Sequence, residues 1–168
     1  MDQATKEMTQ GLRQAMQAER TGHEFYKMAA RTTEDPGGKE VFARLAQEEA
    51  DHFSFLASHY RSLVTEGRLA TQVELGHGVK LDHPIFSPAL RERIGEAHFE
   101  MSALAVAVQL ELNGIQHYRA MAQNTKMPEA RRFFEELVAW ETDHYEALLR
   151  EQEALQEAYW SEAGFEPF

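Results

Sequence analysis

The sequence predicts an all-α fold, a four-helix bundle built from two helical hairpins that one long crossover joins. Three observations favour it. Residue types that favour helix, above all Ala, Glu, Leu, Gln and Met, are abundant, and only five of the 168 residues are proline. Four segments carry apolar residues at helical spacing. The last two segments repeat the first two at a constant offset of 92 residues. We expect one domain over residues 1–168, with hairpins at about 6–65 and 94–157 and a crossover at 67–92.

The first hairpin is predicted to contain helices at about 6–31 and 36–65. Asp35 precedes Pro36, as an N-cap precedes a proline at the first helical position. Gly67 ends the second helix. The apolar stripes contain Met8, Leu12, Ala15, Met16, Tyr26, Ala29 and Ala30 in the first helix, and Phe42, Leu45, Phe53, Leu56 and Leu63 in the second.

The segment 67–92 shows no sustained periodicity and contains several glycines and prolines. It is too long for a tight turn. Its length suits a crossover that runs along the bundle and brings the third helix parallel to the second.

The second hairpin is predicted to contain helices at about 94–123 and 128–157, with Pro128 at the start of the fourth helix. We expect the residues after about Phe165 to form a frayed tail. The apolar stripes contain Leu104, Ala107, Val108, Ile115, Tyr118 and Ala122, then Phe134, Leu137, Val138, Tyr145, Leu148 and Leu155.

Each half of the repeat contains one glutamate and, 30 residues later, a Glu-x-x-His. Aligning residues 19–56 with 111–148 gives 12 identities in 38 positions, where unrelated segments would give roughly 2 or 3. The candidate metal ligands are Glu19, Glu49 and His52 in the first half, and Glu111, Glu141 and His144 in the second.

Helix geometry places the members of each set at one level of the bundle. Glu19 lies 15 residues before the first turn and Glu49 lies 15 residues after it, so both lie about 22 Å from the turn. His52 lies one turn further along the same helix face. All of these residues fall on the apolar stripes, where carboxylates are rare unless they are paired or coordinate metal.

Charge repulsion favours a metal at this level. Two like charges about 4 Å apart repel by roughly 4 kcal/mol at an effective dielectric constant of about 20. Several such pairs would remove much of a typical stability of about 5–15 kcal/mol. Two divalent cations would neutralise four glutamates, and each histidine would complete the coordination of one ion. This ligand set suits iron or manganese, with zinc as a possible substitute; the alternative is a buried salt-bridged network without metal.

Other polar residues near the motifs receive simpler interpretations. Tyr26 and Tyr118 lie two turns past their glutamates and are either core aromatics or hydrogen-bond donors to candidate ligand carboxylates. Glu24 and Glu48 are expected to be solvated or ion-paired, off the ligand face. The motif Glu74-Leu75-Gly76-His77 lies in the crossover without a repeat partner and is interpreted as a chance match. Packing roles are expected for His23, His59, His98 and His117.

Composition excludes several classes of function. The net charge of -11 argues against nucleic acid or an anionic membrane as partner, and its simplest interpretation is a solvated helical surface. The absence of cysteine excludes disulfides, zinc–thiolate sites, iron–sulfur centres and rubredoxin-type iron. The polar N-terminus does not resemble a signal peptide, and the longest apolar run, 101–110, is too short to span a bilayer. We therefore expect a cytoplasmic protein.

The string from Ala18 to Tyr26, followed by Phe42-x-x-Leu45-Ala46-x-Glu48-Glu49-x-x-His52, resembles the rubrerythrin branch of the ferritin-like superfamily. The resemblance covers roughly residues 10–155. It implies a non-haem di-iron site in a bundle with one crossover. It also implies reduction of hydrogen peroxide or dioxygen by the diferrous centre, and a homodimer.

The sequence departs from rubrerythrins in two respects. We expect no rubredoxin domain to supply electrons, because the sequence contains no cysteine, and we therefore expect an external electron donor. Gly114 occupies the position, one turn after Glu111, where rubrerythrins carry a further glutamate. The remaining symmetric set of six resembles the ferroxidase site of bacterioferritin-like proteins.

Three functional hypotheses follow. The first is an oxidoreductase that reduces peroxide or dioxygen in oxidative-stress defence. The second is a ferroxidase or iron-storage protein of ferritin type, for which a hollow cage rather than a dimer is expected. The third is a structural or partner-binding bundle in which metal only stabilises the fold.

Overall fold

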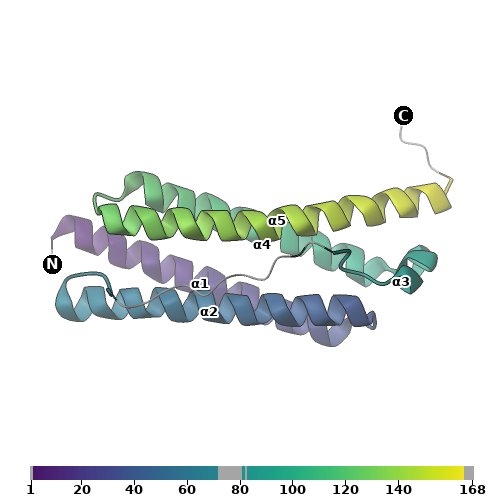
Figure 1. The fold of residues 1–168 in the computed structure, drawn as a ribbon, viewed down its shortest axis with the longest axis horizontal. Helices are drawn as coiled ribbons and strands as arrows, with labels where there is room; N and C mark the ends of the chain where they lie inside the picture. The colour runs from purple at the N-terminus through teal and green to yellow at the C-terminus, as the bar shows by residue number, and fades with distance from the viewer. Residues whose placement is uncertain (1, 72–80, 82, 165–168) are drawn as a thin grey trace.

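The computed structural model describes residues 2–71, 81 and 83–164, and within them it is helical without strands. In Figure 1 the four long helices lie along one another, with α2 and α4 running in one direction and α1 and α5 in the other. The predicted four-helix bundle with one crossover is therefore confirmed. The elements are α1 Gln3–Thr32, α2 Pro36–Glu66, α3 Pro88–Glu92, the 3₁₀ helix η1 Ile94–Glu96, α4 His98–Asn124 and α5 Pro128–Glu162.

Local sequence explains where the long helices begin and end. The carboxylates of Asp2 and Asp35 cap α1 and α2 by accepting hydrogen bonds from backbone N–H groups of the first turn. Proline stands in the first turn of both α2 and α5. Gly67 ends α2 in the left-handed region, at φ 71°, which glycine adopts without strain.

The helices pack as two hairpins, α1 with α2 and α4 with α5, and α1 also packs against α4. Two apolar clusters fill the interior of the bundle. One contains Tyr26, Phe42 and Leu148, and the other contains Leu12, Leu56 and Phe134. Along every long helix the candidate ligands fall between residues of one cluster and residues of the other. A polar layer is therefore enclosed by apolar layers on both sides.

The crossover contains structure that the periodicity did not predict. α3 and η1 occupy positions that were expected to be irregular or to begin the third helix, so α4 starts at His98 rather than near residue 94. Both elements are too short to display a helical period, and they bury Leu90 and Ile94 against the core. α5 continues to Glu162, beyond its predicted end.

Side chains attach the described part of the crossover to the bundle. The carboxylate of Asp35 accepts hydrogen bonds from the backbone and hydroxyl of Ser87. Glu151 on α5 accepts from the backbone N–H of Phe86 and, at 2.6 Å, from the guanidinium of Arg91. The Glu74–His77 motif and the predicted tail from residue 165 lie outside the described residues. Within the described ranges, no helix has the combined length and apolarity needed to cross a membrane.

Candidate metal centre

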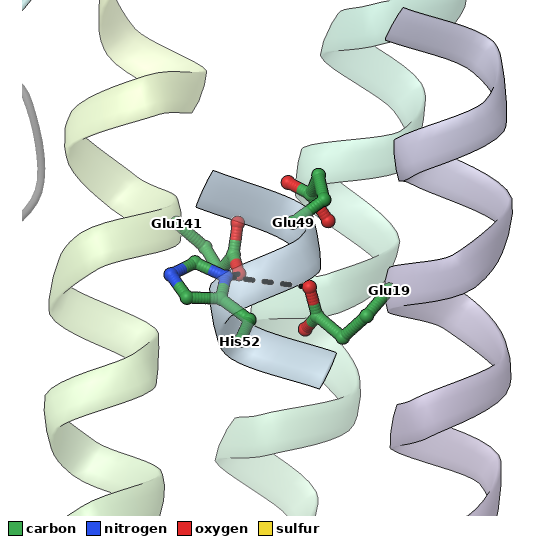
Figure 2. Close-up of side chains that lie close together, drawn as sticks. All are labelled: Glu19, Glu49, His52 and Glu141. Carbon is green, nitrogen blue, oxygen red and sulfur yellow. Dashed lines mark hydrogen bonds and ion pairs between the residues drawn. The ribbon is translucent and has the colours of Figure 1, made fainter. Parts of the chain in front are cut away.

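The structure brings all six candidate ligands together in the polar layer. Their side chains are almost fully buried, with exposed fractions of 5% or less. Figure 2 shows four of them close together between the helices. The contributing elements are α1 with Glu19, α2 with Glu49 and His52, α4 with Glu111, and α5 with Glu141 and His144.

These side chains form two overlapping groups, each of which could hold one metal ion. In each group the donor atoms lie within 4.8 Å of one another. Glu49 and Glu141 belong to both groups, so their carboxylates are placed to bridge two ions. Glu19 and His52 complete the first group, and Glu111 and His144 complete the second.

Both imidazole rings turn the same nitrogen, Nδ1, toward the carboxylates. Nδ1 of His52 lies 3.3 Å from Oε2 of Glu19 and 3.1 Å from Oε1 of Glu141. Nδ1 of His144 lies 3.8 Å from Oε2 of Glu111 and from Oε2 of Glu141. The histidines therefore offer equivalent donor atoms, as the repeat requires.

The two tyrosines bond across the bundle. The hydroxyl of Tyr26 on α1 donates to Oε1 of Glu111 on α4, and the hydroxyl of Tyr118 on α4 donates to Oε1 of Glu19 on α1. Each tyrosine thus contacts the glutamate of the other half of the repeat. Burial, followed by the negative charge of Glu111, raises the pKa of Tyr26 well above its usual value, so this hydroxyl remains a donor.

In the absence of metal the four carboxyl groups favour partial protonation. Burial, followed by the charge of Glu141, raises the pKa of Glu19 far above its usual value and that of Glu111 to about 8. Burial and the charge of Glu19 likewise raise the pKa of Glu49. Burial also disfavours ionisation of Glu141, but the neighbouring Glu111 carboxyl and two histidines hold the pKa of Glu141 well below its usual value. The layer therefore attracts cations, either protons or metal ions.

The geometry around His144 fits a metal ion. Its Nδ1 is buried and, among the described residues, has no hydrogen-bond partner. The distance of 3.8 Å to two carboxylate oxygens is too long for a hydrogen bond. It suits two ligands of one ion, because typical metal–ligand bonds of about 2.0–2.2 Å place neighbouring ligands about 3–4 Å apart. Carboxylates with one imidazole per ion are typical of iron and manganese sites.

Comparison with known proteins agrees with this geometry. The rubrerythrin family model matches residues 10–151, most of the chain. The chain belongs to the rubrerythrin family. No match was found among curated proteins or among solved structures. Membership of the rubrerythrin family implies iron binding, and the buried cluster fits a metal site.

Gly22 follows Glu19 by one helical turn, and Gly114 follows Glu111 in the same way. The two glycines have different neighbours. A β-carbon built on Gly22 would lie 2.8 Å from Oε2 of Glu49, closer than such atoms approach in proteins. A β-carbon on Gly114 would lie 3.8 Å from Cγ of Glu141, in ordinary contact. Gly114 is also where the rubrerythrin resemblance implies a further glutamate, and a β-carbon at this position would make only ordinary contacts.

A cavity of about 310 Å³ between α1 and α4 reaches the cluster. Its lining combines exposed polar residues, among them Gln17 and Asn113, with the buried carboxylates of Glu19 and Glu111. Gly22 also lines the cavity. A small molecule could therefore reach the carboxylates from this side of the bundle.

Glu48 lies off the ligand face and is ion-paired, as expected, but it is buried rather than solvated. Glu48 is buried, and its Oε2 lies 2.7 Å from Nε2 of His144. The repeat offered a signal that was missed, because the equivalent position in the second half is Trp140, whose bulk is unusual for a solvated position. Glu24 is exposed and pairs with Lys27, as expected.

Four further histidines lie outside the two donor groups and make packing or backbone contacts: His23, His59, His98 and His117. Nδ1 of His23 is 2.7 Å from the carbonyl oxygen of Ala46. His59 is buried and stacks on Phe133 with ring centroids 4.7 Å apart. These contacts agree with the packing roles expected from the sequence.

Proposed function

We propose that this rubrerythrin-family protein is a di-iron oxidoreductase that reduces hydrogen peroxide or dioxygen with electrons from an external donor. The observation that carries the proposal is the pair of overlapping donor groups that share Glu49 and Glu141. Such sharing holds two ions close enough to act on one small molecule. Iron is the metal favoured by the family match and by the donor set.

Each side chain has a defined role in this proposal. Glu19 and His52 would hold one ion, Glu111 and His144 would hold the other, and the two shared carboxylates would bridge them. When bound, two ferrous ions supply one electron each, and these two electrons with two protons reduce one hydrogen peroxide to two water molecules. The external donor then returns two electrons. We further propose that the protein acts as a homodimer.

The protein supplies an ordered and largely enclosed environment for this chemistry. Apolar clusters on both sides shield the polar layer from bulk water except at the cavity between α1 and α4. The tyrosine hydroxyls orient the two carboxylates that would bind one ion each, since each donates to one oxygen and leaves the other oxygen for metal. The cavity between α1 and α4 gives a small oxidant a route to the cluster.

A single-turnover experiment tests the proposal. Protein loaded anaerobically with ferrous iron is mixed with peroxide or dioxygen, and its visible and near-ultraviolet absorption is followed while the oxidant is assayed. We expect one peroxide consumed per two ferrous ions oxidised, and repeated turnover when a reductant is supplied. Glu49→Gln combined with Glu141→Gln should abolish both. Glu40→Gln with Glu146→Gln, which removes the same charge from exposed positions of the same helices, should not. Absence of a spectral change with either oxidant would reject the proposal.

A second candidate function is iron handling of ferroxidase type. The observation that favours it is Gly114, which leaves six candidate ligands where the rubrerythrin resemblance implies seven. In that case dioxygen oxidises iron that the cluster then releases, and the protein assembles into a hollow cage. Two measurements distinguish the oxidoreductase from the ferroxidase: sedimentation, and the ratio of iron released to peroxide consumed. A dimer that retains its iron through many turnovers supports the oxidoreductase.

A further inference from the structure

The most informative difference between the two halves of the repeat lies immediately before the shared glutamates. Glu48 precedes Glu49, and its equivalent 92 residues later, Trp140, precedes Glu141. The six candidate ligands are identical in the two halves, so this pair of positions distinguishes the surroundings of the two histidines.

The carboxylate of Glu48 contacts the ring nitrogen of His144 that does not face the cluster. Oε2 of Glu48 lies 2.7 Å from Nε2 of His144, while Nδ1 of the same ring faces Glu111 and Glu141. Donation of the Nε2 proton to the carboxylate leaves the Nδ1 lone pair directed at the cluster. A carboxylate in this position fixes the tautomer and raises the basicity of a histidine ligand. It also adds one negative charge beside this metal position only.

Among the described residues, no carboxylate contacts the corresponding nitrogen, Nε2, of His52. Its ring is fully buried and lies 5.6 Å from the ring of Trp140, tilted by 51°. Within the described part of the chain, Nε2 of His52 has no hydrogen-bond partner. An indole has one N–H donor and no acceptor, so Trp140 cannot accept a proton from this nitrogen. The ring is held in place by packing alone on this side.

We infer that the two metal positions are inequivalent, and that the position at Glu111 and His144 fills first and holds its ion more tightly than the position at Glu19 and His52. At the tight position Glu48 orients the histidine and raises its basicity, whereas at the weak position the histidine packs against Trp140. Removing a supporting carboxylate typically weakens metal affinity by roughly 10–100-fold, and we expect the two positions to differ by a factor of this size. The inference depends on the proposed function only because both require metal at the cluster.

Cobalt(II) binding to the full chain tests the inference without any measurement of activity. Titration against a chelating dye should resolve two steps whose dissociation constants differ by about 10-fold or more. Crystals grown with one equivalent of cobalt should show anomalous scattering beside His144. Equal occupancy of both positions, or a first ion beside His52, would overturn the inference.

Variants then test whether Glu48 causes the difference in metal affinity between the two positions. Glu48→Gln keeps the side-chain size and an accepting oxygen but removes the charge, and it should weaken the first step roughly 10–100-fold while leaving the second unchanged. Trp140→Glu should strengthen the second step. Glu24→Gln removes a charge from an exposed position near the cluster in sequence and should change neither.

A failure of this inference can be distinguished from a failure of the proposed function. Circular dichroism and thermal unfolding check that each variant folds, and the wild-type occupancy measurement needs no variant. If Glu48→Gln folds and leaves both steps unchanged, the inference is wrong. Sequential cobalt binding in a protein whose iron-loaded form does not reduce peroxide would reject the proposed function and leave this inference intact.

Discussion

Gly22 on α1 lies directly against the carboxylate of Glu49 on α2. A β-carbon at Gly22 would lie 2.8 Å from Oε2 and 3.1 Å from Cδ of this glutamate. Since Glu49 belongs to both candidate donor groups, the absence of a side chain at Gly22 determines where a shared ligand can lie. The equivalent glycine of the second half, Gly114, has no comparable neighbour.

Gly22→Ala should therefore damage metal binding, whereas Gly114→Ala should not. The first substitution displaces the Glu49 carboxylate, and we expect metal affinity to fall by about 10-fold or more. The second introduces only ordinary contacts in a helix, where alanine is favoured over glycine by roughly 0.5–1 kcal/mol, so Gly114→Ala should raise stability and keep the affinity. Calorimetric titration with ferrous iron and denaturant unfolding measure the two quantities. Equal affinities for the two variants would contradict this account of Gly22.

Tyr26→Phe and Tyr118→Phe should each lower the stability of the metal-free protein at neutral pH. Each removes a hydrogen bond to a buried carboxyl oxygen, at a cost of about 1–3 kcal/mol. The effects on metal binding should be crossed: loss of Tyr26 weakens binding beside Glu111, and loss of Tyr118 weakens binding beside Glu19. Denaturant unfolding and occupancy at one equivalent of metal test both points.

Tyr60→Phe provides the control for these two variants. Tyr60 accepts a hydrogen bond from Arg13 at 3.1 Å on the exposed side of the bundle. We expect its removal to change stability by no more than about 0.5 kcal/mol. Equal decreases in the free energy of unfolding in all three variants would mean that the buried tyrosine hydrogen bonds contribute no more to stability than the exposed one.

The metal-free protein should lose stability as pH rises from about 5 to 8. Glu111 has a pKa of about 8 when folded and near 4.5 when unfolded, so between these values the folded state alone holds the proton. The raised pKa of His144 acts in the same direction, because its contribution is complete below 6.5 and disappears at higher pH. The lowered pKa of Glu141 contributes stability that is lost only below 4.5, outside this window.

Bound metal should reverse this trend, because it displaces protons and binds more tightly as pH rises. The increase in melting temperature on adding ferrous iron or manganese should thus grow from about pH 5 to about pH 8. Thermal unfolding with and without metal across this range measures the difference. A pH-independent melting temperature of the metal-free protein would show that the carboxyl groups of the cluster are ionised in the folded state.

Asp35→Ala should destabilise the protein more than Asp2→Ala, although both residues cap a helix through their carboxylates. Asp35 is buried and also accepts hydrogen bonds from Ser87 in the crossover, whereas Asp2 is exposed and caps α1 alone. Loss of a cap costs about 1 kcal/mol, and each buried group left without its partner costs about 1–3 kcal/mol more. Denaturant unfolding should separate the variants by at least about 1 kcal/mol. Similar losses would mean that the link to Ser87 contributes nothing.

The sequence predicted the bundle and the level of the cluster because both depend on regular spacing. The helical period and the offset of 92 residues place Glu19, Glu49, Glu111 and Glu141 by geometry alone, and the structure brings them together. α3 and η1 were not predicted, because elements of five and three residues are too short to display a period. Their positions depend on tertiary contacts, such as those of Leu90 and Ile94 with the core.

Contacts between helices set the details that the sequence did not reveal. Glu48 is adjacent to Glu49, so its direction is rotated away from the ligand face, and only the position of α5 decides that it meets His144. The crossed bonds of Tyr26 and Tyr118 likewise depend on the packing of α1 against α4, which no spacing within one helix specifies.

The crossed tyrosine bonds also bear on the origin of the chain. One hairpin alone carries half of the donor atoms and a tyrosine whose acceptor belongs to the other hairpin. A single hairpin of this kind could therefore assemble the centre only as a pair of chains, and duplication with fusion of such a hairpin would produce the repeat seen here. In one chain the two copies can differ, whereas in a pair of identical chains a substitution changes both positions together. Trp140 and Glu48, an indole and a carboxylate at equivalent positions, are a difference that a pair of identical chains could not have.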